Sequence, residues 1–238
     1  MNRDPSVFHV DRLELTFAPK PWAFALERRA EIAAYFAGLQ REKPALWNGR
    51  VLLLHSQVVS EGVLRGAFLE TDYASFSAWR HWGCPPAGVH DCFGAAALVS
   101  SDGAVLLGVM GALTFNVGRI YFPCGTPDPD DIIDGKVDLE SSVQRELKEE
   151  TGLDAAEFTA ELGWTIVVDG ALIVAIKVLR SPLSAEALRA RILDWLARER
   201  QPELSDIRIV RGPGDFDPMM RAFVRAFLEH RWRAEGGR

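Results

Sequence analysis

The sequence predicts a fold that mixes helices and strands, either α/β or α+β, because short segments of the two kinds alternate along the chain. Strand segments show alternating or continuous apolar residues, and helical segments show apolar residues at a spacing near 3.6. The 238 residues exceed what one minimal domain needs and are too few for two large domains. Apolar residues make up 48% and charged residues 25%, which is ordinary for a soluble globular protein.

The N-terminal part is predicted to form strands and helices of its own. A strand, a long helix, two strands after an Asn-Gly turn, and a short helix are expected at 7–17, 21–40, 50–59, 63–69 and 75–82. Gly83 and the Pro85-Pro86 pair then interrupt every periodic pattern. We therefore expect a boundary here, between an N-terminal α/β region over 1–86 and a second domain over 87–238.

The second part is predicted to alternate strands with three helices. Strands are expected at 92–99, 104–109, 119–123, 165–168, 172–179 and 207–210. The first two are joined by a Ser-Asp-Gly hairpin signal, and a Pro/Asp-rich loop is expected at 125–135. Helices are expected at 139–151, from Ser184 as N-cap to Arg200, and from Asp217 as N-cap with Pro218 as the first helical residue.

Charge and composition exclude several classes of protein. The net charge of −6 argues against a general nucleic-acid-binding protein, which needs basic surfaces to neutralise phosphates. No apolar run is long enough to span a membrane, and residues 1–10 lack an export signal, so cytoplasmic residence is expected. Cys84, Cys92 and Cys124 form no metal-binding spacing and are expected to be reduced.

The segment 138–153 carries the clearest chemical signal, and it begins with an aspartate suited to an N-cap and ends near a glycine suited to the C′ position. Glu146 and Glu150 are four residues apart on one helix face, and Glu149 lies within about 100° of both. These carboxylates repel one another where the helix dipole also disfavours negative charge. A divalent cation resolves the conflict, because Mg²⁺ and Mn²⁺ prefer carboxylate oxygens.

The alternative is an acidic, solvated helix face that Arg145 and Lys148 partly neutralise. For three glutamates alone, this alternative is favoured. The context changes the preference, because 145–153 fits the motif Arg-Glu-hydrophobic-x-Glu-Glu-x-Gly-hydrophobic at every defined position. A chance match in a chain of this length is on the order of one in a hundred thousand at average residue usage. The motif therefore favours a metal site.

This motif resembles the core of the Nudix box, and Phe122-Pro123-Cys124-Gly125 is similar to the strand and glycine that open such a box. The resemblance implies an α/β/α sandwich with a mixed sheet, here preceded by a small α/β N-terminal region that helps to shape the substrate pocket. It also implies water attack on one phosphorus of a diphosphate, with metal ions neutralising the developing charge.

The resemblance implies roles for four residues of the motif. Glu146, Glu149 and Glu150 would bind Mg²⁺ or Mn²⁺, and one of them would activate water, with Glu149 and Glu150 as the catalytic candidates. Arg145 would hold the glutamates and the loop by ion pairs.

Two departures from the family pattern concern the loop before the helix. Gly125 and Arg145 are 20 positions apart, against 14 in the standard box, so the loop carries a six-residue insertion. Where the box has its first glutamate, this chain has Val137. Asp134, Asp138 and Glu140 are the acidic residues available nearby.

Weaker similarity extends over 20–155. The stretches 47–55, 71–76 and 122–129 are similar to a eukaryotic Nudix group that includes plant enzymes acting on GDP-mannose and an animal UDP-glucose/UDP-galactose diphosphatase. Coenzyme A-type Nudix enzymes carry an arginine where this chain has Met110. The resemblance therefore favours cleavage of a nucleoside-diphosphate sugar into a nucleoside monophosphate and a sugar phosphate.

Candidate substrate-binding residues are Gly125, Tyr73 and Trp79. Trp79 has core packing as its favoured interpretation and an aromatic platform for a base or sugar as the alternative. His55 is expected to pack in the core.

Charged residues near the strand at 207–210 leave two alternatives each. Glu203 and Asp206 would supply an additional acid or belong to a solvated loop. Arg208 and Arg211 would meet a phosphate or pair with that loop.

The sequence as a whole predicts a Mg²⁺-dependent hydrolase of a small nucleoside diphosphate compound. The alternatives are a non-catalytic Nudix module that binds a nucleotide as a sensor, and a Nudix enzyme for another nucleotide diphosphate. Neither nucleic acid nor a membrane is expected as a partner. The oligomeric state is open, with a homodimer as one alternative.

Overall fold

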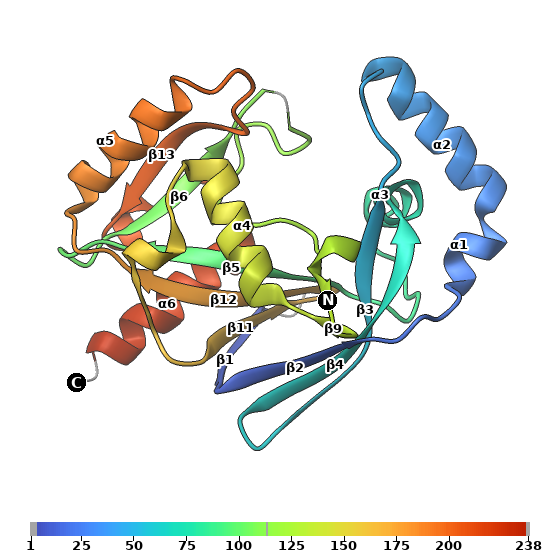
Figure 1. The fold of residues 1–238 in the computed structure, drawn as a ribbon, viewed down its shortest axis with the longest axis horizontal. Helices are drawn as coiled ribbons and strands as arrows, with labels where there is room; N and C mark the ends of the chain where they lie inside the picture. Colours follow the sequence, from blue (N-terminus) through green and yellow to red (C-terminus); the bar gives the residue numbers. More distant parts are fainter. Residues whose placement is uncertain (1–3, 113, 237–238) are drawn as a thin grey trace. The chain divides into compact units, whose positions relative to one another are not determined.

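The computed structural model describes residues 4–112 and 114–236, and the chain folds into two compact units (Figure 1). Unit 1 comprises Met1–Arg12, Phe93–Gly125 and Leu139–Arg238, and unit 2 comprises Leu13–Cys92 and Thr126–Asp138. The predicted boundary after residue 86 lies near the crossing at Cys92 and Phe93. The chain also passes between the two units after Arg12, Gly125 and Asp138. The sequence did not predict these points, because strand pairing joins segments that are far apart in the sequence.

Unit 1 is built on one mixed sheet in the order β1-β11-β12-β5-β6-β13, with β10 beside β12 and β7 beside β6. The strands are β1 (Ser6–Val10), β5 (Asp91–Val99), β6 (Val105–Met110), β7 (Ile120–Tyr121), β10 (Thr159–Ala160), β11 (Trp164–Asp169), β12 (Leu172–Arg180) and β13 (Leu204–Val210). β1 runs antiparallel to β11. The Ser181 N–H donates to the Val99 carbonyl at 2.7 Å, so the carboxyl ends of β12 and β5 meet and these two strands run parallel.

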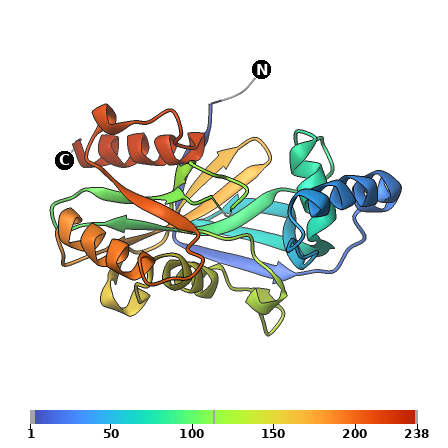
Figure 2. The same cartoon turned by 90° about the horizontal axis from the view of Figure 1, so that it is seen from above.

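Helices cover both faces of this sheet. They are α4 (Leu139–Thr151), α5 (Ala185–Leu196) and α6 (Ala222–Gly236). Seen from above, α6 lies on one face and α4 and α5 lie on the other (Figure 2). A Cβ atom at Gly94 of β5 would lie 2.5 Å from Val143 of α4, so this glycine lets the helix approach the strand closely. The α/β/α layering predicted for this part of the chain is confirmed.

Unit 2 has a second sheet in the order β3-β4-β2-β9-β8. Its elements are β2 (Arg12–Phe17), α1 (Ala23–Glu27), α2 (Arg29–Glu42), β3 (Arg50–Ser60), β4 (Val63–Asp72), α3 (Tyr73–His81), β8 (Ile132–Ile133) and β9 (Lys136–Val137). Glu61 and Gly62 both have positive φ, 52° and 70°, which is the two-residue hairpin turn that joins β3 to β4. The predicted α/β character of the N-terminal region is confirmed.

Three elements before α4 differ from the prediction. The strand expected at 7–17 is two strands in different sheets, with a bend at Asp11 between β1 and β2. The helix expected at 21–40 is interrupted at Arg28, whose φ of −104° and ψ of 19° are not helical. The loop expected at 125–135 contains most of a small hairpin, β8 with β9, because apolar Ile132 and Val137 pair across its turn.

The two C-terminal helices are shorter than predicted. α6 begins at Ala222 and not after Asp217, whose carboxylate accepts the Met219 N–H at 2.8 Å and forms a turn instead. α5 has the predicted N-cap, since the Ser184 hydroxyl accepts the Ala187 N–H. It ends at Leu196, before the predicted Arg200, in a tight turn.

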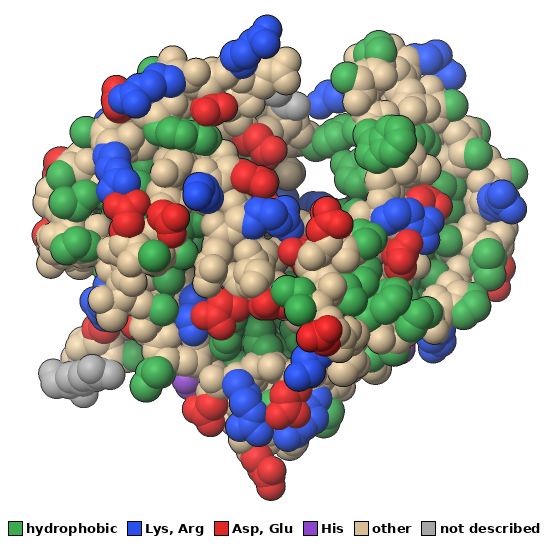
Figure 3. Space-filling view, viewed as in Figure 1, with side chains coloured by type: hydrophobic (Ala, Val, Ile, Leu, Met, Phe, Trp, Pro, Cys, Tyr) green, Lys and Arg blue, Asp and Glu red, His purple; other side chains and the backbone are tan. Residues whose placement is uncertain are grey.

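Charged side chains of both signs lie on the face shown in Figure 3, where Lys and Arg are intermixed with Asp and Glu among the described residues. No helix in the described ranges is long and apolar enough to cross a membrane. Cys84, Cys92 and Cys124 are all free.

Candidate carboxylate site in unit 1

The helix that carries the motif is α4, and it covers the predicted range. Leu139, Val143 and Leu147 form its buried stripe and hold it against the sheet. Gly152 ends the helix with a φ of +70° and donates its N–H to the Lys148 carbonyl at 2.9 Å. The three glutamates of the motif therefore lie in the last turns of a helix whose orientation is fixed by apolar packing.

Glu150 is the buried member of the set, with 3% of its surface exposed. One carboxylate oxygen, Oε1, accepts the Cys124 N–H at 3.0 Å. The other, Oε2, is buried and has no hydrogen-bond partner in the part of the chain that the structure describes. Burial raises the pKa of Glu150 well above its ordinary value, and the charges of Glu146, Glu203 and Glu149 add to the increase.

Glu146 lies over Gly125, and this contact gives the predicted glycine a specific role. A Cβ atom at residue 125 would lie 2.4 Å from the Glu146 carboxyl carbon, so only glycine leaves the carboxylate in place. The Arg145 Nη1 donates to Glu146 Oε1 at 2.8 Å and lies 4.0 Å from Glu149 Oε2. Arg145 thus contacts the glutamates as expected, and Glu149 is the exposed member of the set, with 62% of its side chain accessible.

Glu203 belongs to the same electrostatic cluster. Its charge acts on Glu150, and loss of water around its own carboxyl together with the charge of Glu149 raises the pKa of Glu203. Its carbonyl accepts the Gly111 N–H at 2.6 Å, which ties the start of the β6–β7 loop to the site. Asp206 is separate, since it pairs with Arg189 at 2.6 Å. Of the two acids considered from the sequence, the structure brings only Glu203 to the glutamates.

The sequence did not single out Asn116, Tyr121 or Arg221, and the structure brings these residues together around β7. The Tyr121 hydroxyl accepts a hydrogen bond from Asn116 Nδ2 at 3.2 Å. Burial raises the pKa of Tyr121, the negative charges of Cys124 and Glu150 raise it further, and the positive charge of Arg221 lowers it. Tyr121 therefore lies under the influence of both Glu150 and Arg221. No local motif marks these residues, because β7 and the segment before α6 meet only in the folded chain.

The residues of this cluster suit a divalent cation, although they do not enclose one as they stand. Among the described His, Cys, Asp and Glu side chains, no group of three or more is close enough to hold a metal ion. The Oε2 of Glu150 is nevertheless a buried carboxyl oxygen that has no hydrogen-bond partner among the described residues, and the charges of other acids act on it. Carboxylate oxygens are the ligands that a hard cation such as Mg²⁺ prefers.

The aromatic candidates of unit 2 have different environments. Trp79 is 1% exposed, its indole N–H donates to the Pro85 carbonyl at 2.9 Å, and its ring packs against Trp22. Core packing therefore describes Trp79, and the aromatic-platform hypothesis fails for it, because no face of its ring is open to a ligand. Tyr73 is partly buried between Phe36 and Phe76, and burial raises its pKa.

Other residues considered from the sequence are accounted for locally. His55 is half-buried, with Nε2 3.2 Å from the Ala18 carbonyl. Val137 is buried in β9, with 4% exposed. Arg208 pairs with Asp217 at 3.0 Å. Arg211 pairs with Asp102 and Glu186 at 3.0 and 2.7 Å. Both arginines thus have acidic partners, but these partners lie outside residues 203–206, of which 204–206 belong to β13 and not to a loop.

Comparison with known proteins finds no matching family model and no matching curated protein. The chain is similar in structure to the MutT protein of Methanosarcina mazei, with 19% identity, a TM-score of 0.41 and coverage of 61% of this chain and 95% of that one. For the Nudix domain of Shewanella oneidensis NrtR, solved with ADP-ribose, identity is 16%, the TM-score 0.40 and coverage 66% and 97%. For the Nudix hydrolase RenU of M. smegmatis, identity is 17%, the TM-score 0.38 and coverage 60% and 86%. Likeness at this level says nothing about what the present chain binds or cleaves.

Proposed function

We propose that this protein is a Nudix-type hydrolase that uses Mg²⁺ or Mn²⁺ to cleave a diphosphate linkage. The observation that supports the proposal most strongly is Glu150, a nearly fully buried carboxylate with one unpartnered oxygen among three other acids. A structural helix face does not need such a group, because a buried charge without a partner costs free energy. A site that binds a cation does need it.

Each residue of the cluster has a distinct task in this proposal. Glu150 supplies the buried oxygen, which the Cys124 N–H orients from the other side. Glu146 supplies a second carboxylate, which Gly125 accommodates and Arg145 holds by a charged hydrogen bond. The exposed Glu149 is free of the packing that fixes Glu150 and is the candidate to accept a proton from the attacking water. A bound Mg²⁺ would supply Lewis-acid stabilisation of the charge that develops on the phosphoryl group.

The substrate class that we propose is a nucleoside-diphosphate sugar. The support is the similarity of 47–55, 71–76 and 122–129 to sugar-nucleotide hydrolases and the methionine at residue 110 in place of the coenzyme A arginine. Trp79 is buried and is therefore not a candidate for a contact with the sugar or base. Tyr73 is still a candidate for a contact with the sugar or base.

The deciding experiment is a panel of diphosphates assayed with and without Mg²⁺. UDP-glucose, GDP-mannose, ADP-ribose, ATP and coenzyme A are compared by kcat/KM. Metal-dependent release of a nucleoside monophosphate from one of the sugar compounds is the expected result. A higher kcat/KM for ATP or coenzyme A would refute the substrate class and leave the hydrolase assignment standing. No release from any compound would refute both.

A non-catalytic module that binds a nucleotide as a sensor is the second candidate. It is favoured by Val137, which stands where the box has its first glutamate and is buried in β9, and by the inserted loop. Calorimetric binding of a panel compound without any product release would select it.

A further inference from the structure

Arg221 is a half-buried arginine whose guanidinium makes no hydrogen bond or ion pair with any described residue. The other arginines of comparable burial do have partners. Arg145 pairs with Glu146, Arg189 with Asp206, and Arg231 with Glu161 and Glu235. In a chain with a net charge of −6, a half-buried arginine without a carboxylate partner is available to an anion that comes from outside the chain.

The backbone places Arg221 beside β7, and the chain after β7 leads to Cys124, whose N–H binds Glu150. The Arg221 N–H donates to the Ile120 carbonyl at 3.3 Å, and Ile120 and Met220 form a parallel bridge. Tyr121 follows Ile120, and its hydroxyl is held by Asn116 from the β6–β7 loop. The charges of Arg221 and Glu150 both act on the Tyr121 phenol and change its pKa in opposite directions.

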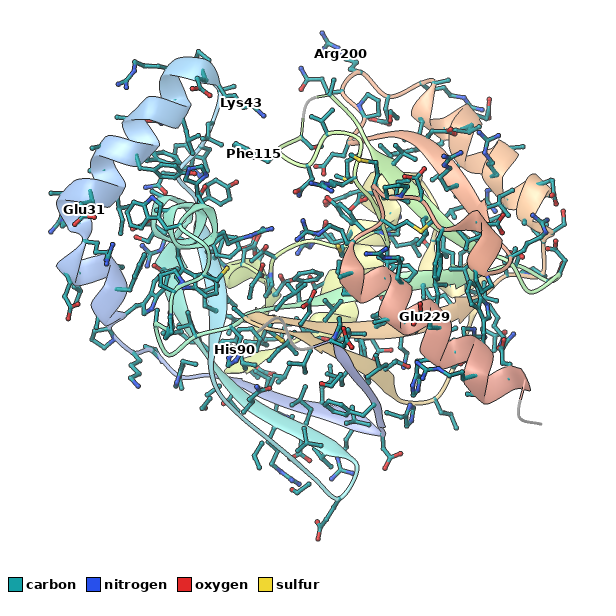
Figure 4. All side chains as sticks on the ribbon, turned by 180° about the vertical axis from the view of Figure 1, so that it is seen from behind. Glu31, Lys43, His90, Phe115, Arg200 and Glu229 are labelled. Atoms are coloured by element: carbon teal, nitrogen blue, oxygen red, sulfur yellow. The ribbon has the colours of Figure 1, made fainter. Side chains whose placement is uncertain are left out.

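The β6–β7 loop contacts both Glu203 and Tyr121. Gly111, at its start, donates to the Glu203 carbonyl, and Asn116, in its middle, reaches Tyr121. Phe115 lies on this loop and is 48% exposed (Figure 4). The loop therefore connects an acid of the cluster to the phenol beside Arg221, and an anion bound there would contact residues of both.

We propose that Arg221, together with the Asn116–Tyr121 pair, binds the phosphate of a diphosphate that is distal to the carboxylate cluster. This inference rests on the proposed function and extends it, since it assigns the two phosphates to different groups. A guanidinium can donate two parallel hydrogen bonds to phosphate oxygens, and the Asn116 amide can donate another. α6 begins directly after Arg221, so the positive end of its dipole adds to the attraction.

The test measures binding and not turnover. Methylenediphosphonate, in which carbon replaces the bridging oxygen so that hydrolysis is prevented, is titrated calorimetrically into the 238-residue protein with Mg²⁺. Arg221→Gln is expected to raise Kd at least about tenfold, which corresponds to the loss of charged hydrogen bonds. Arg225→Gln is the matched control, because Arg225 is an exposed arginine one turn further along α6. It is expected to change Kd by less than about twofold.

Several outcomes would overturn the inference. They are a wild-type protein that does not bind the diphosphonate, an Arg221→Gln variant with wild-type Kd, and an Arg225→Gln variant that loses as much affinity as Arg221→Gln. If Arg221→Gln does not fold, Arg221→Lys takes its place. That variant keeps the charge but loses the forked geometry and is expected to raise Kd by about threefold or more, whereas an unchanged Kd would count against the proposal.

The same protein samples separate this inference from the proposed function. Hydrolysis of a panel compound with no effect of Arg221→Gln on diphosphonate binding refutes the inference alone. Binding that depends on Arg221 in a protein that hydrolyses none of the compounds refutes the hydrolase and keeps the phosphate site.

Discussion

Glu150 carries a free-energy cost in the metal-free protein, because its charged form is buried with one oxygen unsatisfied. A carboxyl with a raised pKa stabilises the fold below its ordinary value of 4.5, and this contribution is lost as the pH rises through the raised value. At neutral pH, Glu150→Gln is therefore expected to melt at the same or a higher temperature than wild type in EDTA. Its Mg²⁺-dependent turnover is expected to fall about 100-fold or more.

The check pairs turnover with melting curves over a range of pH. Wild-type protein in EDTA should lose stability with rising pH relative to Glu150→Gln. A variant that keeps full activity, or one markedly less stable than wild type in EDTA, would contradict the role given to Glu150.

A substitution at Gly125 tests whether the position of the Glu146 carboxylate matters for turnover. In Gly125→Ala the new methyl group would occupy the space of the Glu146 carboxylate, which must rotate away. Since the displaced atoms end a flexible side chain, we expect a small change in melting temperature and a loss of turnover of about tenfold or more, similar to the loss of a group that supports a metal ligand. Gly212→Ala is the control, because no atom lies within 4 Å of its added Cβ. Equal kcat values for the two variants would show that the position of Glu146 is unimportant.

At the scale of elements, α4 matches its predicted bounds because local signals define it. The spacing of the apolar residues and the glycine after the last turn can both be seen in the sequence. In the structure the apolar residues are buried and the glycine is in the left-handed region. The missed features are set by partners elsewhere in the chain. The sequence pattern of β1 and β2 is that of one strand, but the two segments pair in different sheets. Pro218 is typical of a helix start, but Met220 forms a bridge with Ile120 of β7 instead.

The end of α4 gives a stability prediction. Gly152→Ala would strain a residue at φ +70° and also place a methyl group 2.3 Å from the Trp195 ring. Gly103→Ala has the same kind of strain at φ +82° with open space around the methyl group. We expect a loss of about 1 kcal/mol for Gly103→Ala and a further loss of about 1–3 kcal/mol for Gly152→Ala. Urea denaturation measures both, and equal losses would show that Trp195 yields without cost.

At the scale of the whole molecule, the sequence identified the glutamates, Arg145 and, as one of two alternatives, Glu203, but it did not identify Tyr121 or Arg221. Glu146, Glu149, Glu150 and Arg145 lie within one helix, so their spacing alone brings them together. Tyr121 and Arg221 are separated by 100 positions and meet through a strand bridge that no periodic pattern announces. Trp79 shows the opposite difficulty, because helical spacing cannot distinguish a buried ring from an exposed one.

The division into units predicts how fragments behave. A fragment of residues 87–238, cut at the boundary that composition indicates, would lack β1 and leave the edge of β11 unpaired. It would also lose Val10, which is fully buried. We expect this fragment to aggregate or to melt at a lower temperature than the full chain. Calorimetric melting and size-exclusion chromatography are the measurements, and a monomeric fragment with the melting temperature of the full chain would contradict the expectation.

The pairing of β1 with β11 has a consequence for synthesis on the ribosome. Ile166, the partner of Phe8, is made 158 residues after it, which at about 5–20 residues per second is a delay of about 8–30 seconds. Unit 2 also stays incomplete until its last segment, Thr126–Asp138, has been made. During this interval β1 has no strand partner, so its unpaired backbone groups can form strand pairs with another copy of the chain.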